Sequence, residues 1–157
     1  MTSPGRGEVF SYKNFELTLY GSHNLDGMRQ WVKRQQYQSS CPSWDLVLLA
    51  FSKRAWPDLK AMIKLWERLI KSCPSVYKKV LLCSFEHTKA WKPNASEKLA
   101  VDQIVAQSDR KLFWSESWRD FESFLTIKQD QQHKPFNILV IGSYYFVSTC
   151  RDQLAQK

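Results

Sequence analysis

The sequence is poor in glycine. It has five glycines among its 157 residues, and none of them stands in a motif for nucleotide binding or hydrolysis. There is no G-x-G-x-x-G segment, so the chain has no dinucleotide fingerprint, and no G-x-x-x-x-G-K-[ST] segment, so it has no P-loop. The G-x-S-x-G segment that presents the nucleophile of a serine hydrolase is missing too. None of these three active sites is therefore expected.

Cysteine and histidine are also scarce. The chain has three histidines and four scattered cysteines, Cys41, Cys73, Cys83 and Cys150, which form no C-x-x-C pair. A zinc site needs several such ligands at characteristic spacings and is therefore not expected. We interpret the cysteines as single buried thiols of a protein in a reducing compartment.

Long apolar segments are absent as well. No apolar run reaches the length that spans a bilayer, and the first residues lack an apolar export signal. We therefore expect a cytoplasmic protein without a membrane partner. The net charge of +8 favours anionic ligands such as nucleotides, polyglutamate tails or nucleic acid. Because Lys and Arg are spread along the chain, without a basic tail or an RNA-binding aromatic motif, nucleic acid is not the expected partner.

The sequence does contain a regular series of strand patterns. Residues 8–12 and 15–20 alternate between polar and apolar side chains, which predicts a hairpin. Three later segments are short apolar runs of the kind found in strands buried on both faces: residues 45–51, 79–85 and 137–143. Residues 111–114 form a further short strand pattern.

Helix patterns separate these strands. Asn24 and Asn94 are expected helix caps, the second in a capping box with Glu97, and Pro57 stands at a favoured first-turn position. An apolar stripe over residues 118–125 predicts another helix, residues 128–134 an exposed loop, and the chain turns helical after Ser143. The alternation predicts an α/β fold: one Rossmann-like, three-layer domain over residues 1–157, with a mostly parallel sheet and the N-terminal β-hairpin at one edge.

In such sheets ligands bind at the carboxyl ends of the strands. The predicted ends hold both Gly-Ser steps, residues 21–22 and 142–143, and two of the three histidines, His23 and His87. A glycine followed by a helix N-terminus allows close approach of an anion to free N–H groups. The alternative is that these are turn residues and that Ser143 is a helix cap. A turn, however, does not need the imidazole of His23.

Three segments resemble one known family. Residues 4–9, Pro-Gly-Arg-Gly-Glu-Val, and residues 20–27, Tyr-Gly-Ser-His-Asn-Leu-Asp-Gly, resemble the start of the C-terminal domain of the dihydrofolate synthase/folylpolyglutamate synthase family. That family reads P-G-R-x-E-V and, after a hairpin, D-G-A-H-N-P-D-G. Residues 142–145, Gly-Ser-Tyr-Tyr, resemble its G-S-x-Y before the last helix. The three motifs stand in the family's order near both ends of the chain.

The resemblance implies the Mur-ligase-like C-terminal domain of an ATP-dependent, ADP-forming ligase. Such a ligase adds glutamate to dihydropteroate or folate through an acyl phosphate. The P-loop ATPase domain, which binds most of the ATP and the magnesium, would be N-terminal and is absent from this chain. The chain alone is therefore expected to be inactive. Its partners would be that domain, ATP, glutamate, and dihydropteroate or folate.

The resemblance also implies site residues. The nucleotide would contact Arg6, Tyr20, His23 and Asn24, and the incoming glutamate would contact His23, Ser143 and Tyr145. Tyr20 stands where the family has Asp, and a tyrosine can stack or donate a hydrogen bond but supplies no carboxylate. Two interpretations follow. The chain is the C-terminal domain of a working ligase, or it is a non-catalytic anion- or nucleic-acid-binding module on the same fold.

Overall fold

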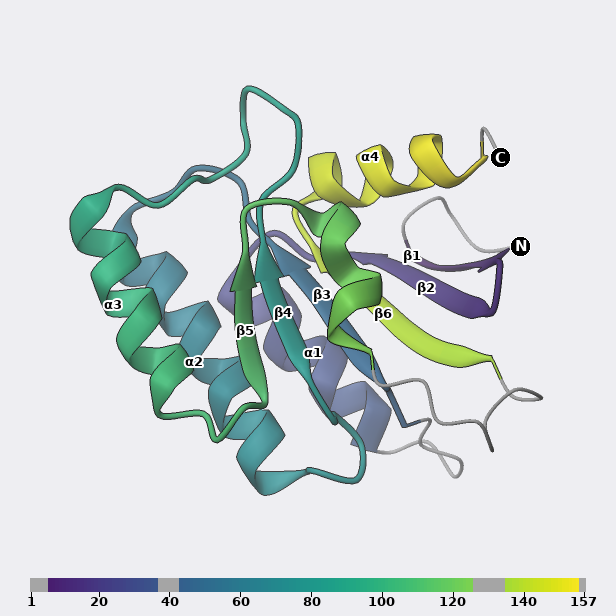
Figure 1. Ribbon diagram of the computed structural model, residues 1–157, viewed down its shortest axis with the longest axis horizontal. Coiled ribbons are helices and arrows are strands. Elements are labelled where there is room, and N and C mark those ends of the chain that lie inside the picture. Colours follow the sequence, from purple (N-terminus) through teal and green to yellow (C-terminus); the bar gives the residue numbers. More distant parts are fainter. Residues whose placement is uncertain (1–5, 37–42, 126–134, 156–157) are drawn as a thin grey trace.

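A six-stranded sheet forms the centre of the computed structural model, which describes residues 6–36, 43–125 and 135–155. The strands follow the order β1-β2-β6-β3-β4-β5 across the sheet (Figure 1). Their bounds are β1 (Arg6–Tyr12), β2 (Phe15–Gly21), β3 (Leu46–Ala50), β4 (Val80–Cys83), β5 (Leu112–Ser115) and β6 (Phe136–Gly142). β1 is antiparallel to β2, and all other neighbouring strands are parallel. The predicted sheet, with its hairpin at one edge, is confirmed.

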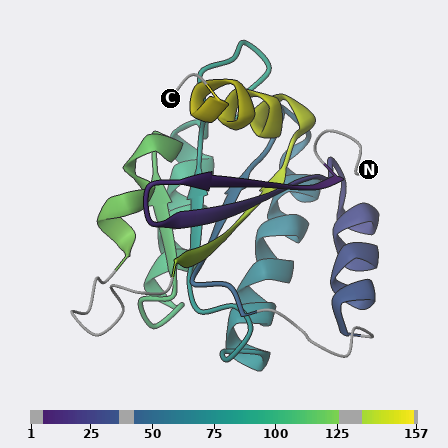
Figure 2. The same cartoon turned by 90° about the vertical axis from the view of Figure 1, so that its right-hand side faces the viewer.

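Helices cover both faces of this sheet. They are α1 (Leu25–Gln36), α2 (Trp56–Ser72), α3 (Ala95–Ala106), the 3₁₀ helix η1 (Trp118–Phe124) and α4 (Tyr144–Ala155). α1, α2 and α3 pack on one face, and η1 and α4 pack on the other. Figure 2 shows α1 and η1 on opposite sides of the sheet. The predicted three-layer α/β architecture is therefore confirmed.

The apolar runs explain why the strands lie in the middle layer. All five residues of β3 are buried. Val47 and Leu49 face the layer of α1, α2 and α3, whereas Leu46 and Leu48 face α4 and η1. Burying one such side chain contributes about 1.5–3 kcal/mol, so a strand that is apolar on both faces gains most between two helix layers.

The predicted helix caps hold as well. The Asn24 side chain accepts a hydrogen bond from the backbone N–H of Gly27 at 2.7 Å. Asn94 and Glu97 form the complete capping box at the start of α3, and Pro57 lies in the first turn of α2. These bonds use N–H groups that the first turn of a helix cannot satisfy internally. The starts of α1, α2 and α3 are thus local properties of the sequence.

The helix predicted at residues 118–125 is present, and it is the 3₁₀ helix η1. Its two buried side chains, Trp118 and Phe121, are three residues apart, and three residues make one turn of a 3₁₀ helix. An apolar stripe over so few residues fits the 3.0 residues per turn of a 3₁₀ helix as well as the 3.6 residues per turn of an α-helix. The loop predicted at residues 128–134 lies outside the described residues.

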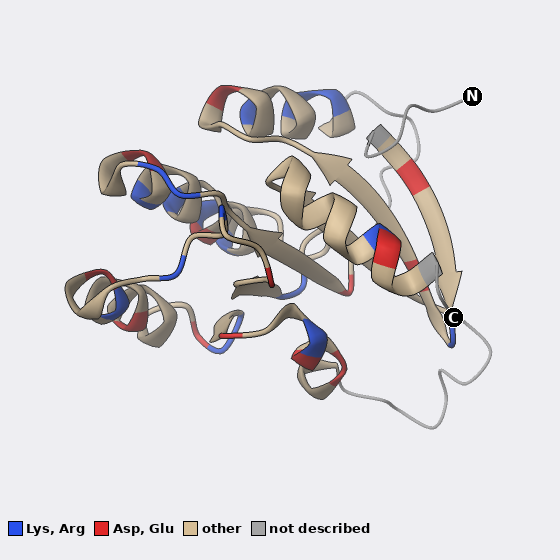
Figure 3. Cartoon of the chain, turned by 90° about the horizontal axis from the view of Figure 1, so that it is seen from above, with Lys and Arg blue, Asp and Glu red and all other residues tan. Residues whose placement is uncertain are grey.

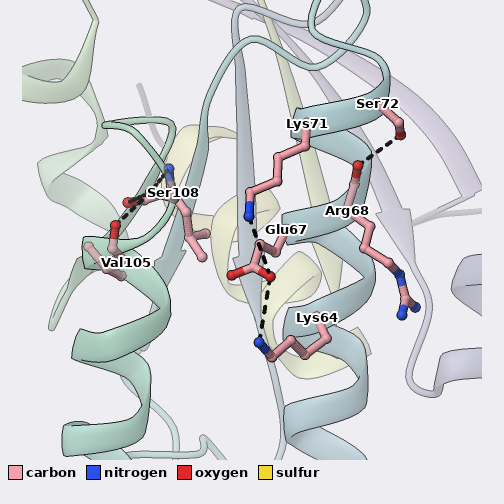
Figure 4. A network of polar contacts seen from close by, with 8 residues as sticks. Lys64, Glu67, Arg68, Lys71, Ser72, Val105 and Ser108 are labelled. Carbon is pink, nitrogen blue, oxygen red and sulfur yellow. Dashed lines mark hydrogen bonds and ion pairs between the residues drawn. The ribbon is translucent and has the colours of Figure 1, made fainter.

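Lys, Arg, Asp and Glu residues are dispersed over the helices and loops (Figure 3). Among the described residues, Glu67 of α2 is the one charged residue that is buried, with 7% of its surface exposed. Its carboxylate lies 3.6 Å from the ammonium of Lys64 and 4.0 Å from that of Lys71 (Figure 4). A buried carboxylate without such neighbours would be costly. The network thus serves the stability of α2 and lies outside the site described below.

The cysteines are consistent with a structural role. Cys83 and Cys150 are fully buried, and burial raises the pKa of both thiols. Both therefore stay protonated and are poor nucleophiles. Cys73 is half-buried, and Cys41 lies outside the described residues. Within the described ranges, no three His, Cys, Asp or Glu side chains gather as metal ligands, and no helix is long and apolar enough to cross a membrane.

The carboxyl end of β6 depends on a glycine. Gly142 has φ +138°, a region that favours glycine, and a Cβ there would lie 2.0 Å from the Ala50 carbonyl oxygen. We predict that Gly142→Ala lowers the free energy of unfolding by at least about 2 kcal/mol, because strain and a backbone clash add. Urea denaturation measures the change.

Gly27→Ala is the matched control. There the added Cβ meets two side-chain atoms that can shift by rotation, the Ser22 hydroxyl at 2.8 Å and the Asn24 cap oxygen at 3.1 Å, and alanine favours a helix by about 1 kcal/mol. We expect stability within about 1 kcal/mol of the parent. Equal losses in the two variants would contradict a special role for position 142.

Candidate functional site

Three neighbouring strands end in one row. Gly21 of β2 lies beside Gly142 of β6, and Gly142 lies beside Ala50 of β3. The pairing continues one step further: the Ser22 N–H donates to the Gly142 carbonyl at 2.7 Å, and the Ser143 N–H donates to the Ala50 carbonyl at 3.0 Å. Beyond this row, α1 and α2 leave toward one face of the sheet and α4 leaves toward the other. Such divergence at strand ends opens a crevice for ligands.

Two hollows lie in this crevice. The first hollow, of about 500 Å³, lies along the start of α1 and is lined by Tyr20, Gly21, Ser22, His23, Asn24, Asp26, Gly27, Gln30, Arg34 and Tyr144. The second hollow, of about 340 Å³, lies over the ends of β3 and β6 and is lined by His23, Ser52, Lys53, Arg54, Ser143, Tyr144 and Tyr145. His23 and Tyr144 line both, and their ring centroids are 5.5 Å apart. These two rings form a ridge between the hollows.

The first hollow is rich in hydrogen-bond donors. The guanidinium of Arg34 donates to the Tyr20 hydroxyl at 2.6 Å and lies 5.9 Å from the centre of its ring. The Ser22 hydroxyl is buried and has no hydrogen-bond partner among the described residues. The carboxylate of Asp26 accepts from the Gln30 side chain. Apart from Asp26, the groups of this hollow suit an anion.

In the second hollow, Ser143 is held from two sides. Its hydroxyl shares a hydrogen bond of 2.5 Å with the Ser52 hydroxyl and accepts from the backbone N–H of Tyr145 at 3.1 Å. Ser143 is 1% exposed, whereas Tyr144 and Tyr145 are 44% and 43% exposed. The helix cap therefore holds the backbone at the start of α4, which carries these two exposed aromatic rings.

The loops after β3 and β4 close the far side of the second hollow. They are joined by backbone hydrogen bonds, from Lys53 N–H to the Lys89 carbonyl and from Trp91 N–H to the Phe51 carbonyl. The His87 ring lies 4.6 Å from the Tyr145 ring. Lys53 and Arg54 are exposed at the rim, and neither forms an ion pair with any residue that the structure describes. Their charges are available to a ligand.

The predicted site residues fall into the two hollows. Tyr20, His23 and Asn24 line the first, and His23, Ser143 and Tyr145 line the second. The backbone of Arg6 pairs with Tyr20 at the start of β1, but its side chain lies outside the described residues. Asn24 and Ser143 also act as helix caps, so folding alone accounts for those two side chains. It does not account for His23.

The motifs and patterns of the sequence assign no role to Arg34, Lys53 or Arg54. Lys53 and Arg54 stand at a predicted strand end, which brings them to the right edge of the sheet without indicating a partner. Arg34 is fourteen residues from Tyr20 in the chain. It lies in the last turn of α1 and is exposed, as most arginines on helix surfaces are. Only the fold shows that its side chain reaches back to the strand end.

No family model and no curated protein matches this chain, but solved structures do. It resembles folylpolyglutamate synthase of Mycobacterium tuberculosis, complexed with ADP and AMPPCP (TM-score 0.67, 16% identity, 99% of this chain and 33% of that chain). It also resembles the Thermotoga maritima folylpolyglutamate synthase (0.60, 14%, 98% and 31%). E. coli FolC in complex with DHPP and ADP is similar too (0.59, 13%, 98% and 32%). The resemblance inferred from the three motifs is thus confirmed at the level of the fold. The chain spans about a third of the length of these proteins.

The role of Ser143 as a cap can be measured. We predict that Ser143→Ala destabilises the protein by about 1–2 kcal/mol, because the Tyr145 N–H and the Ser52 hydroxyl both lose their partner. Ser52→Ala is the control: it removes the shared hydroxyl bond and leaves the cap, so its effect is expected to be smaller. Thermal unfolding of both variants tests this. A Ser143→Ala protein that melts with the parent would rule out the cap as a source of stability.

Proposed function

We propose that this chain is the Mur-ligase-like C-terminal domain, residues 1–157, of a ligase that joins glutamate to dihydropteroate or folate with consumption of ATP. The observation that carries the proposal is the pair of hollows with a shared wall. A nucleotide in the first hollow and a glutamate in the second would both contact His23. A ligase that uses ATP to activate a carboxylate must bring phosphate, acceptor and amine together, and this arrangement serves that need.

The first hollow fits a nucleotide. Tyr20, His23 and Tyr144 offer ring surfaces, and Arg34 and the start of α1 offer donors for phosphate oxygens. Arg6 would approach from the start of β1, which pairs with the end of β2. The solved structures with this fold include complexes with ADP and AMPPCP. We therefore assign nucleotide contacts to Arg6, Tyr20, His23 and Asn24.

The second hollow fits an amino acid with two carboxylates. Lys53 and Arg54 supply two positive charges at its rim, and no acidic side chain stands among its lining residues. Charge-assisted hydrogen bonds to carboxylates are the strong class of hydrogen bond in proteins. The hydroxyl of Tyr145 and the imidazole of His23 add donors for orientation. We therefore assign glutamate contacts to His23, Ser143 and Tyr145, with Lys53 and Arg54 as the cations.

The chain supplies positioning rather than the whole reaction. A carboxylate at neutral pH is not electrophilic, so ATP must first convert the acceptor to an acyl phosphate, which the amine of glutamate attacks with release of phosphate. Asp26 is the one acidic side chain lining the two hollows, which is a poor donor set for magnesium. We therefore place the magnesium and the P-loop in an N-terminal ATPase domain, and the reaction in the cytoplasm.

One observation favours the alternative, a non-catalytic anion-binding module on the same fold. Tyr20 occupies the position of the family's Asp, packs 6.0 Å from the Trp31 ring and is bonded to Arg34. Both contacts are with α1, so Tyr20 packs against this helix as a structural residue would. The two functions differ in the second hollow, since a module that binds one anion does not need a glutamate site.

The first test of this proposal is an assay of the purified chain with ATP, magnesium, dihydropteroate and glutamate. We expect no ADP and no ligation product, because the chain lacks a P-loop. Calorimetry of the same preparation should show that glutamate binds. Glutamine, which has one carboxylate fewer, should not displace it. Turnover by the chain alone would contradict the domain assignment. Binding of ADP without glutamate would favour the module.

The shared role of His23 gives a second test. We expect His23→Asn to weaken both ADP and glutamate binding about tenfold, because one ring borders both hollows and a charged ligand loses a donor. His87→Asn is the matched control for ADP: this exposed histidine lies at the same edge but lines neither hollow, and its ring contacts Tyr145 of the second hollow only, so its ADP affinity is expected to stay at the parent's value. Calorimetry reports affinity and thermal melts report folding. Unchanged affinity for both ligands in His23→Asn would remove this residue from the site.

A further inference from the structure

We propose that Arg34, held in place by Tyr20, is an anion-binding residue of the first hollow, and that the hollow takes a nucleoside phosphate through a phosphate on this guanidinium. The inference deepens the proposed function and rests on it for the identity of the nucleotide. Neither the motifs nor the resemblance assigns a role to Arg34. It comes to the hollow from the last turn of α1, far along the helix from the Gly-Ser-His-Asn segment.

The direction of the bond between the two side chains is the first argument. Arg34 can only donate, so the Tyr20 oxygen is the acceptor of the 2.6 Å bond. The phenol therefore keeps its own O–H as a donor, and the guanidinium keeps most of its N–H groups. Both residues line the same hollow. Donors from two side chains, one of them cationic, thus lie together at its wall.

The uncompensated charge is the second argument. Among the described residues, Arg34 has no carboxylate within ion-pair distance, and the acidic residue that lines the hollow, Asp26, is bonded to Gln30. An Asp at position 20, as in the motif D-G-A-H-N, would pair with Arg34 and cancel its charge. Tyrosine orients the guanidinium and leaves the charge in place. With Tyr at position 20, this wall keeps a positive charge that can bind an anion.

Ser22 adds an independent observation. The same motif has Ala at this position, whereas the Ser22 side chain lines the hollow and is 4% exposed. Its hydroxyl is without a hydrogen-bond partner among the described residues. A buried hydroxyl without a partner is costly, and a rotation of the Ser22 side chain toward the hollow would let an oxygen of a bound ligand supply one. Two of the three departures from the motif, Tyr20 and Ser22, thus place hydroxyl groups at one hollow.

The experiment is calorimetric titration of the 157-residue chain with ADP, pyrophosphate and adenosine. We expect ADP to bind at least tenfold more tightly than adenosine, and Arg34→Gln to remove that difference. Arg29→Gln is the matched control, because Arg29 is an exposed arginine of the same helix that does not line the hollow. Tyr20→Asp should lower ADP affinity about as much as Arg34→Gln, since the new carboxylate would pair with Arg34. Thermal melts establish that each variant is folded.

The outcomes separate clearly. Pyrophosphate that binds as tightly as ADP supports the anion site at Arg34 but overturns the assignment of a nucleoside phosphate to the hollow. Equal ADP affinity in Arg34→Gln and Arg29→Gln overturns the inference, as does tighter ADP binding by Tyr20→Asp or a parent chain that binds neither phosphate compound at millimolar concentration. Glutamate is titrated in parallel. Its failure to bind would remove the proposed ligase function and leave the result for Arg34 intact.

Discussion

The close approach of β6 to β3 is the constraint on which the carboxyl edge depends. The Ala50 carbonyl occupies the space where a side chain at position 142 would stand, and it accepts the N–H of Ser143. Because Gly142 permits this contact, β6 lies between β2 and β3 up to its last residue, and α4 begins directly above the sheet. α4 then leaves toward the face opposite α1 and α2. The two hollows, with Tyr144 on the ridge between them, follow from that divergence.

Charge gives the hollows their chemistry. Among the described residues, they are lined by three cationic side chains, Arg34, Lys53 and Arg54, and one carboxylate, Asp26. The overall charge of +8 alone does not single out this edge, since Lys and Arg occur on many elements (Figure 3). Lys64, Lys71 and Lys98 have acidic partners, whereas the three cations of the site have none among the described residues and line hollows. Paired charges stabilise the helices, and unpaired charges in a hollow remain for a ligand.

The sequence predicts what is local and misses what the fold alone brings together. Apolar runs and the caps at Asn24 and Asn94 identify the strands and helices because each depends on residues a few positions apart. The helix at η1 was predicted, but its 3₁₀ type was not, because seven residues cannot separate the two helical periods. The grouping of Tyr20 with Asn24 was predictable from one segment. The bond between Ser52 and Ser143 spans 91 positions, and that between Tyr20 and Arg34 spans 14, so neither leaves a mark in a local pattern. The roles of the site residues remain predictions.

At the carboxyl ends of the strands, some residues are required for folding and others are not. The residues that folding does not require support a role in ligand binding. Gly142 is required by the backbone, and Asn24 and Ser143 are required as caps. Tyr144 and Tyr145 are more than two-fifths exposed, so much of their apolar surface contributes nothing to the core. His23, which borders both hollows, is exposed as well. The exposed rings of Tyr144 and Tyr145 lie against those of His23 and His87, next to hollows lined by Arg34, Lys53 and Arg54. Ring surface beside unpaired cations is the combination on which the proposed contact with a nucleotide rests, because a nucleotide joins a flat base to an anion.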